Sequence, residues 1–218
     1  MQRLISHCFA GIVMLVLVSC AGTVDVTKRQ RSQRSIVPVS AAQQNDFATA
    51  LDLMKKRSYA KAIPILESIV KENNRLVGVH INLAIAYMKL TEDDAETENL
   101  QKAEQALLQA VALNKREAVA YFQLGLLYRQ TGRFAQAQQS YQQAIRYNAN
   151  YSMAHFNLGV LCDIFLQQAE CAIEQFEAYR ALVPAESEKI NLWLSDIRRR
   201  AGIPEPVAPE PNAGQTSS

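Results

Sequence analysis

The amino-acid sequence predicts an all-α fold, a solenoid of four helix-turn-helix repeats closed by one capping helix. A pattern of apolar and small residues returns about every 34 residues between positions 43 and 186. Within each copy the apolar residues recur at intervals of three and four, the spacing of one face of an α-helix. A Gly or Ala recurs where the two helices of each pair would cross. Three or more stacked repeats are needed to bury a continuous core, and four meet that requirement.

The clearest copy of the pattern lies in residues 118–151. Its members are, in order, Tyr121, Leu124, Gly125, Tyr128, Ala137, Tyr141 and Ala144. This spacing resembles the tetratricopeptide repeat (TPR), which has an aromatic residue, a Leu-Gly pair and a Tyr on its first helix, and an Ala and a large apolar residue on its second. The resemblance implies a right-handed TPR solenoid over residues 43–201.

The two preceding copies are in the same register. Residues 43–76 contain Ala50, Leu53, Tyr59, Ala62, Leu66 and Ile69. Residues 77–117 contain His80, Leu83, Ala84, Tyr87, Ala103, Leu107 and Ala110. An acidic insertion over residues 91–99 is expected to lengthen the turn between the two helices of the second repeat, because the cost of closing a loop grows only slowly with its length.

The fourth copy covers residues 152–186. It contains His155, Leu158, Gly159, Cys162, Ala172, Phe176, Tyr179 and Pro184. One extra residue is expected in its inner turn. Pro184 is the proline that the TPR pattern places after the second helix, and the corresponding residues of the other repeats are Asn74, Lys115 and Ala149.

The segment 187–201 predicts the capping helix. Its apolar residues at helical spacing are Ile190, Trp193, Leu194, Ile197 and Ala201. Gly202 and Pro204 are expected to end the helix, and Trp193 to pack on the fourth repeat. The run of Arg198, Arg199 and Arg200 favours a solvated last turn that complements the helix dipole, with an anionic partner as the alternative. The Pro-rich composition of residues 202–218 predicts a disordered tail.

The N-terminal residues 1–19 predict a signal peptide. The apolar run from Cys8 to Val18 is too short for a membrane span, which takes about 20 residues. The ending Leu17, Val18, Ser19, Cys20 resembles a bacterial lipobox. The resemblance implies cleavage before Cys20 and acyl chains on its sulfur and amine, whereas the alternative is an ordinary secretory signal with an incidental Cys.

Lipid on Cys20 would anchor the chain to a membrane, since several acyl chains together bind almost irreversibly. Ala21 follows, where lipoproteins retained in the inner membrane commonly have Asp, so the expected location is the bacterial outer membrane, facing the periplasm. Residues 20–42 are expected to form a flexible tether. Its basic residues, Lys28, Arg29, Arg31 and Arg34, either contact anionic headgroups or are a solvated charge run.

Two cysteines, Cys162 and Cys171, remain in the mature domain, and they flank the turn of the fourth repeat in an oxidising compartment. A disulfide is expected because antiparallel helices bring such residues together. Two alternatives stay open: their side chains point apart, or they bind a metal with His155. No catalytic motif, cofactor-binding loop or other metal motif is found. The net charge of +2 gives no indication of a nucleic-acid partner, and no small-molecule substrate is indicated.

The concave face of the first helices is the predicted binding site for a protein or peptide partner. Its expected lining is Phe47, Leu51, Met54, Ile81, Asn82, Ile85, Met88, Phe122, Gln123, Leu126, Arg129, Phe156, Asn157, Val160 and Asp163. The amides of Asn82, Gln123 and Asn157 can both donate and accept hydrogen bonds, and in related repeats such amides hold the backbone of an extended peptide. The alternative is that these residues only pack neighbouring repeats.

Together these features indicate an outer-membrane lipoprotein that acts as a non-catalytic scaffold. The architecture resembles the lipoproteins that pilot pilus or secretion-channel subunits to the outer membrane. The resemblance implies a role in assembling an envelope complex such as a type IV pilus or secretion channel. The alternatives are an adaptor for peptidoglycan-processing enzymes and a structural subunit of an outer-membrane assembly machine.

Overall fold

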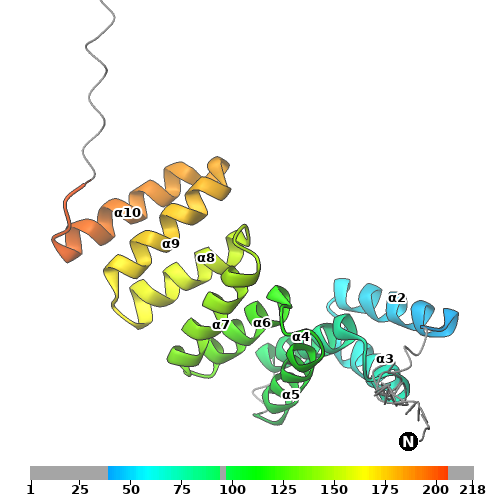
Figure 1. Cartoon of the computed structure of the whole chain (residues 1–218). Coiled ribbons are helices and arrows are strands. Elements are labelled where there is room, and N and C mark those ends of the chain that lie inside the picture. The colour runs from blue at the N-terminus through cyan, green and yellow to red at the C-terminus, as the bar shows by residue number, and fades with distance from the viewer. Residues whose placement is uncertain (1–38, 94–96, 206–218) are drawn as a thin grey trace, which may run out of the picture. The chain divides into compact units, whose positions relative to one another are not determined.

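The computed structural model describes residues 39–93 and 97–205. The predicted signal peptide, Cys20, and most of the predicted tether and tail lie outside the described residues. The described chain is helical, with no strand in it, and successive helices pack in antiparallel pairs (Figure 1). A solenoid of four helix pairs and one capping helix, as the sequence predicts, is confirmed.

The helices follow the predicted repeats closely. The first two pairs are α2 (Ala41–Lys55) with α3 (Tyr59–Glu72), and α4 (Val77–Asp93) with α5 (Thr97–Leu113). The next two are α6 (Ala118–Gln130) with α7 (Phe134–Tyr147), and α8 (Ser152–Val160), continued by the π-helical turn η1 (Leu161–Phe165), with α9 (Ala169–Leu182). A 3₁₀ turn, η2 (Pro184–Glu186), leads into the capping helix α10 (Ser187–Ala201), which packs on α9.

Short polar segments begin the first helix and form the inner turns. Ser40 and Gln43 form a reciprocal capping box at the start of α2, two residues earlier than the sequence pattern predicts. The inner turns of repeats 1, 3 and 4 each contain one residue in the left-handed region, namely Arg57, Gly132 and Gln167. Gly132 suits this conformation without strain, because it has no Cβ.

In repeats 3 and 4 a glycine of the first helix faces an aromatic ring of the second. A Cβ added to Gly125 would lie 2.4 Å from the ring of Tyr141, and one added to Gly159 would lie 3.0 Å from the ring of Phe176. In the first two repeats the same positions hold Ala with Leu. These pairs, fully buried, are Ala50 with Leu66 and Ala84 with Leu107. At these positions, therefore, Gly occurs with an aromatic residue and Ala with Leu.

Two predictions about irregular segments are wrong. The acidic insertion of the second repeat does not simply lengthen the turn, because α4 and α5 are each 17 residues long whereas α6 has 13 and α7 has 14. The extra residue of the fourth repeat does not enlarge the inner turn either. It is taken up within the first helix, as the π-helical turn η1. A π turn absorbs one residue while keeping the backbone hydrogen-bonded.

One side chain in each of repeats 2 to 4 hydrogen-bonds to the turn that precedes its helix. The pairs, each separated by six residues, are His80 Nε2 to the Asn74 carbonyl (2.9 Å), Tyr121 hydroxyl to the Lys115 carbonyl (3.4 Å) and His155 Nε2 to the Ala149 carbonyl (3.0 Å). Both histidines are buried. Because a carbonyl can only accept, the ring nitrogens donate, so each histidine ties its helix to the preceding turn.

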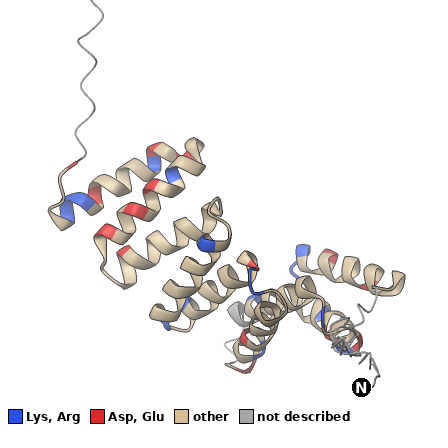
Figure 2. Ribbon diagram, in the orientation of Figure 1, with Lys and Arg blue, Asp and Glu red and all other residues tan. Residues whose placement is uncertain are grey.

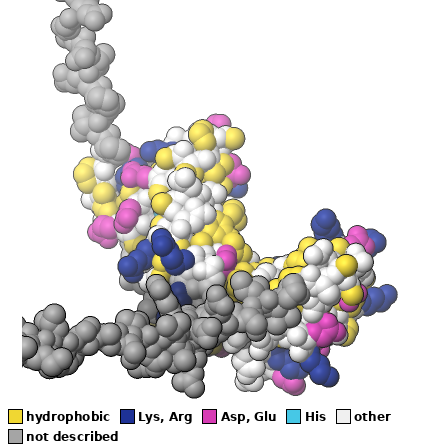
Figure 3. Space-filling model, turned by 45° about the vertical axis from the view of Figure 1, so that its right-hand side comes forward, with side chains coloured by type: hydrophobic (Ala, Val, Ile, Leu, Met, Phe, Trp, Pro, Cys, Tyr) yellow, Lys and Arg dark blue, Asp and Glu magenta, His cyan; other side chains and the backbone are white. Residues whose placement is uncertain are grey.

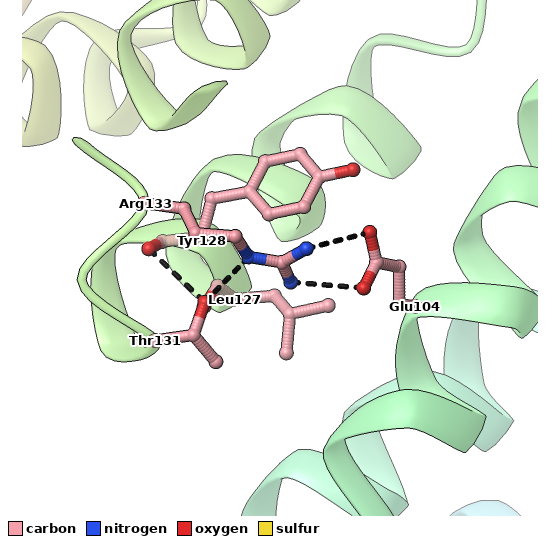
Figure 4. Close-up of polar contacts among 5 residues, drawn as sticks. All are labelled: Glu104, Leu127, Tyr128, Thr131 and Arg133. Carbon is pink, nitrogen blue, oxygen red and sulfur yellow. Dashed lines mark hydrogen bonds and ion pairs between the residues drawn. The ribbon is translucent and has the colours of Figure 1, made fainter. Parts of the chain in front are cut away.

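An ion pair joins repeats 2 and 3. Arg133, at the start of α7, donates from both terminal nitrogens to the two carboxylate oxygens of Glu104 on α5, at 3.0 and 2.9 Å (Figure 4). Its Nε donates to the hydroxyl of Thr131, and its guanidinium lies 4.3 Å from the ring centre of Tyr128. The hydrogen bonds from Arg133 hold the pKa of Glu104 below its usual range. In the next junction the same two positions hold Gln138 and Gln168, which are hydrogen-bonded at 2.9 Å.

The capping helix is held by aromatic and charged contacts. Trp193 packs against Phe156 and Phe176, at ring-centre distances of 5.7 and 5.5 Å. The expectation of a fully solvated arginine run is wrong for Arg198, because its side chain is only 8% exposed and pairs with Glu177 on α9 and with Glu205. Burial of a paired arginine fixes the last turn of α10 against the fourth repeat.

Candidate peptide-binding groove

The first helices of repeats 2 to 4 form the side of the solenoid on which the sequence places the groove. They carry few charged residues: within the described residues α8 has none, and Arg129 is the single one on α6 (Figure 2). Figure 3 shows exposed hydrophobic side chains gathered in the middle of the described part of the chain, beside a cluster of Lys and Arg side chains. A weakly charged concave surface suits an apolar ligand segment.

A cavity of 450 Å³ opens between α4, α6 and η1. We call it the central groove. Its lining is Ile85, Met88, Lys89, Gln123, Leu126, Arg129, Gln130 and Phe165. Five of these residues belong to the set that the sequence assigns to the concave face. The apolar side chains come from three different repeats, so a ligand held there would touch three repeats at once.

The polar lining of the central groove can hold a peptide backbone or an acidic side chain. Gln123 supplies an amide that both donates and accepts. Within the described chain, Arg129 makes no ion pair or hydrogen bond to another side chain. Its half-buried guanidinium therefore keeps its five donors for a ligand. The lining of the central groove thus combines apolar side chains with two cationic residues, Lys89 and Arg129.

Three lining residues, Lys89, Gln130 and Phe165, are absent from the set predicted by the sequence, and Phe165 is the apolar one among them. It belongs to η1, where the extra residue of the fourth repeat is accommodated, and it is 42% exposed. Its ring stacks against Phe134 of the preceding repeat, at a centre distance of 4.7 Å. The sequence signals this region only through the extra residue of the fourth repeat. That residue shows that the segment is longer, but not that the helix, rather than the turn, accommodates it.

Phe122 is assigned to the groove by the sequence, and this assignment is wrong. Its side chain is 7% exposed and packs on the rings of Tyr141 and Tyr151, at 5.9 and 4.8 Å. Phe156 is half-buried, and its ring contacts the rings of Phe176, Tyr179 and Trp193. Both are packing residues between successive helices, which is the alternative that the sequence left open for this position.

Other predicted lining residues lie elsewhere. Ile81 is buried in a small cluster with Ala110 and Ala120. Phe47 lines a separate apolar cavity of 310 Å³ between α2 and the start of α4. Val160 and Asp163 line a cavity of 260 Å³ between α8 and α10. Leu51 and Met54 are half-buried on α2 and do not line the central groove. The predicted surface is thus divided into separate hollows.

The two asparagines are less available than Gln123. Asn82 donates from its Nδ2 to the carbonyl of Gly78 at 2.8 Å, and Asn157 donates to the carbonyl of Met153 at 2.8 Å. Asn157 is also buried. Their amide nitrogens are bonded one turn back along their own helix, so only Gln123 of the three predicted amides lines the central groove.

Cys162 and Cys171 are joined by a disulfide in the structure, with their Cα atoms 5.9 Å apart. His155 does not form a metal site with them: its Nδ1 lies 2.8 Å from the side-chain oxygen of Gln175. No group of three or more His, Cys, Asp or Glu residues in the described chain could hold a metal ion. None of the helices in that part of the chain is long and apolar enough to span a membrane.

Comparison with known proteins agrees with this architecture. The sequence profile of the TPR repeat matches residues 125–162. A crystal structure of MamA protein is 20% identical, with a TM-score of 0.63 over 74% of this chain and 83% of that chain. MamA from Desulfovibrio magneticus RS-1, from residue 41 to its end, is 16% identical, with a TM-score of 0.63 over 76% and 89%. No curated protein sequence matches the chain. At these identities the likeness is one of fold.

Proposed function

We propose, from the premise that this chain has the TPR fold of protein-interaction scaffolds, that it binds a peptide segment of a partner protein in the central groove. The cavity between α4, α6 and η1 is the observation that carries the proposal. Ile85, Leu126 and Phe165 would bury an apolar side chain of the partner. Gln123 would bond the partner's backbone, and Arg129 would attract a carboxylate beside the anchor.

The proposal extends to the location of the scaffold. Leu17, Ser19 and Cys20 follow the lipobox order, and Ala21 follows them, which supports lipidation and transfer to the outer membrane. The TPR domain would then face the periplasm and hold one component of an envelope complex, such as a type IV pilus or secretion channel. The function needs no catalytic group, since the groove only has to bind.

The lipid anchor is tested by Cys20→Ala in a bacterial host that processes lipoproteins. The variant should lose metabolic labelling with a fatty acid and should leave the outer-membrane fraction, because residue 20 then carries no acyl chains to hold the domain there. Equal labelling and equal membrane recovery of the two proteins would rule out the anchor, whatever the groove binds.

The groove is tested by site-specific photo-crosslinking in cells. A photoreactive residue at Gln123, in the groove, should capture one partner protein, whereas the same residue at Gln139, exposed on α7, should not. Capture of a pilin or secretin subunit supports the proposal. Capture of a wall hydrolase or of a barrel-assembly component keeps the groove but assigns it to an adaptor or an assembly machine. Equal capture from both positions would reject the groove.

A further inference from the structure

One face of the capping helix α10 is open to solvent. The corresponding faces of α6 and α8, the first helices of repeats 3 and 4, are covered by the helices that follow them. Phe122 and Phe156 each lie three residues before the Gly at the helix crossing, and each is packed by aromatic rings of the helices that follow. Leu192 occupies the same place in α10, three residues before Ser195. Its side chain is 70% exposed. The helix that would complete a fifth pair is missing within the described chain.

The sequence that follows α10 does not have the pattern of a second helix. Gly202 ends α10 in a left-handed conformation. After it the sequence has prolines at 204, 206, 209 and 211 and then only small and polar residues. Proline in a helix interior removes a hydrogen bond and clashes with the preceding turn. A segment of this composition is not expected to form the amphipathic helix that would cover Leu192, and within the described chain this face is open to a second molecule.

Four exposed residues form one stripe along α10. They are Glu188, Leu192, Ser195 and Arg199, spaced by four, three and four positions. The stripe is opposite the face that packs on α9, which contains Ile190, Leu194 and Ile197. It runs roughly 16 Å along the helix. It has an acid at one end, a base at the other, and a large residue beside a small one at its centre.

The order of these four residues along α10 makes the stripe complementary to a second copy that runs in the opposite direction. In an antiparallel pair with the two-fold axis between residues 193 and 194, Glu188 of one copy faces Arg199 of the second. Leu192 of each copy faces Ser195 of the other, where the small side chain leaves room for it. A two-fold interface is self-complementary by construction. We propose that two copies of this chain associate through an antiparallel pairing of their α10 helices.

Arg199 can exchange its partner Asp196 for Glu188 of the second copy without leaving a charge unpaired. In the single chain it pairs with Asp196, but Asp196 also receives a hydrogen bond from Nε of Arg200 at 2.9 Å. When Arg199 turns to Glu188 of the second copy, Asp196 keeps Arg200. The side chain of Arg199 is 75% exposed, so little else holds it in place. The pairing lies on the opposite side of α10 from its packed face, apart from the central groove.

The association is expected to be weak. A single helix pair buries much less than the roughly 1,600 Å² of a standard interface, so the concentration series should extend to on the order of 100 µM. Sedimentation velocity of the full chain in detergent solution, over a concentration series, should show a monomer–dimer equilibrium in this range. Leu192→Ala should weaken it by about tenfold or more, since both copies lose their central contact. A wild-type chain that stays monomeric at the highest concentration overturns the proposal.

Charge reversal tests the register of the pairing. Glu188→Arg and Arg199→Glu should each weaken association by about tenfold, because each places like charges at both ends of the stripe. Mixing these two variants should restore it, since each variant then meets the opposite charges. The double variant should also associate as the wild type does. A mixture no better than the separate variants overturns the antiparallel arrangement, and helical circular dichroism confirms that each variant is folded.

Cross-linking provides a second measurement. A chain with Leu192→Cys mixed with a chain with Ser195→Cys should form the 192–195 disulfide in preference to the 192–192 and 195–195 disulfides, as peptide mapping would show. Equal yields of all three, or yields at the level of a cysteine placed on α7 at Gln139, would overturn the proposal. Dimers that form through another surface would lack this preference.

Discussion

Gly125 lies directly beneath the ring of Tyr141, so closely that a Cβ atom at Gly125 would come within 2.4 Å of both Cδ1 and Cε1 of the tyrosine. The ring is fully buried and cannot swing away. The absence of a side chain at position 125 is therefore a packing requirement of the third repeat.

Gly125→Ala should lower the free energy of unfolding by about 3 kcal/mol, the upper range for overpacking of a core. Combining it with Tyr141→Leu should recover part of that loss, because the pair then becomes Ala with Leu, as at Ala84 and Leu107. Urea unfolding of the two single variants and the double variant would measure the coupling. Additive losses would contradict size matching. Gly78→Ala, where nothing lies within 4 Å of the added Cβ, is the control and should not destabilise the chain.

The hydroxyl of Tyr141 is buried without a hydrogen-bond partner in the described chain, and burial raises its pKa to about 12. Tyr141→Phe should therefore be neutral or stabilising, by up to about 1 kcal/mol near pH 7. Because the raised pKa belongs to the folded state, the unfolded tyrosine ionises first as the pH rises above about 10. The wild type should then lose stability relative to the variant between about pH 10 and 12. Parallel curves for the two proteins over this range would contradict the prediction.

The pairing of Glu104 with Arg133 predicts the opposite pH dependence. Its folded-state pKa is lowered, so its stabilisation is present above the ordinary glutamate pKa of about 4.3 and is lost as the pH falls through the lower value of the folded chain. Glu104→Gln should cost about 1 kcal/mol at pH 7, and the difference should disappear in acid. Chemical unfolding at a series of pH values checks this. Glu98→Gln, at an exposed residue, is the control and should change little.

The disulfide predicts a stability difference on reduction. The bridge joins residues nine apart, for which the chain-entropy argument gives about 2–3 kcal/mol. Cys162→Ala with Cys171→Ala should lower the free energy of unfolding by at least this amount, since Cys162 is also fully buried. Peptide mapping without reductant should find the two cysteines in one cross-linked species. Two thiols that are freely alkylated in the native protein would contradict the bridge.

Substitutions in the central groove should weaken partner binding, whereas substitutions in the core should lower stability. Leu126→Ala and Arg129→Ala should each weaken binding of the captured partner by about tenfold, while Arg129→Ala leaves unfolding nearly unchanged. Phe122→Ala should instead lower the free energy of unfolding by about 3 kcal/mol, because the ring is buried. Leu108→Ala, at a side chain 48% exposed on α5, is the control for binding. Titration calorimetry and urea unfolding of the same variants would measure both properties. Unchanged affinity in both groove variants would exclude the central groove.

The fold could be predicted because each repeat carries its own local signals. Gly125 and Ala137 mark one helix crossing, and the interval between repeats identifies the rest. The site could be predicted only in part, because periodicity gives the face of a helix but not what the next helix places over it. Phe122 and Phe156 were assigned to the groove for this reason. Phe165 was missed because nothing local distinguishes a π turn from a longer loop.

Ion pairs between residues that are far apart in the sequence account for other features that the sequence did not predict. Arg198 is the first of three adjacent arginines, and its sequence neighbours give no reason to bury it. Its burial depends on Glu177, 21 positions earlier and on another helix. The same holds for Arg133 and Glu104, which lie in different repeats. Pairing of this kind becomes visible only when the helices are placed together.

The bridge between Cys162 and Cys171 also changes what a protease could do to the chain. Phe165, Gln167 and Gln168 lie inside the loop that the bridge closes, and all three are exposed. A cut there would leave the two fragments covalently attached and their helices paired. A cut beside Arg57 or Gly132, in the matching turns of the first and third repeats, would divide the chain into two separate pieces. The turn of the fourth repeat, which carries the exposed ring of Phe165 beside the central groove, is thus the turn at which a cut backbone leaves the domain covalently linked.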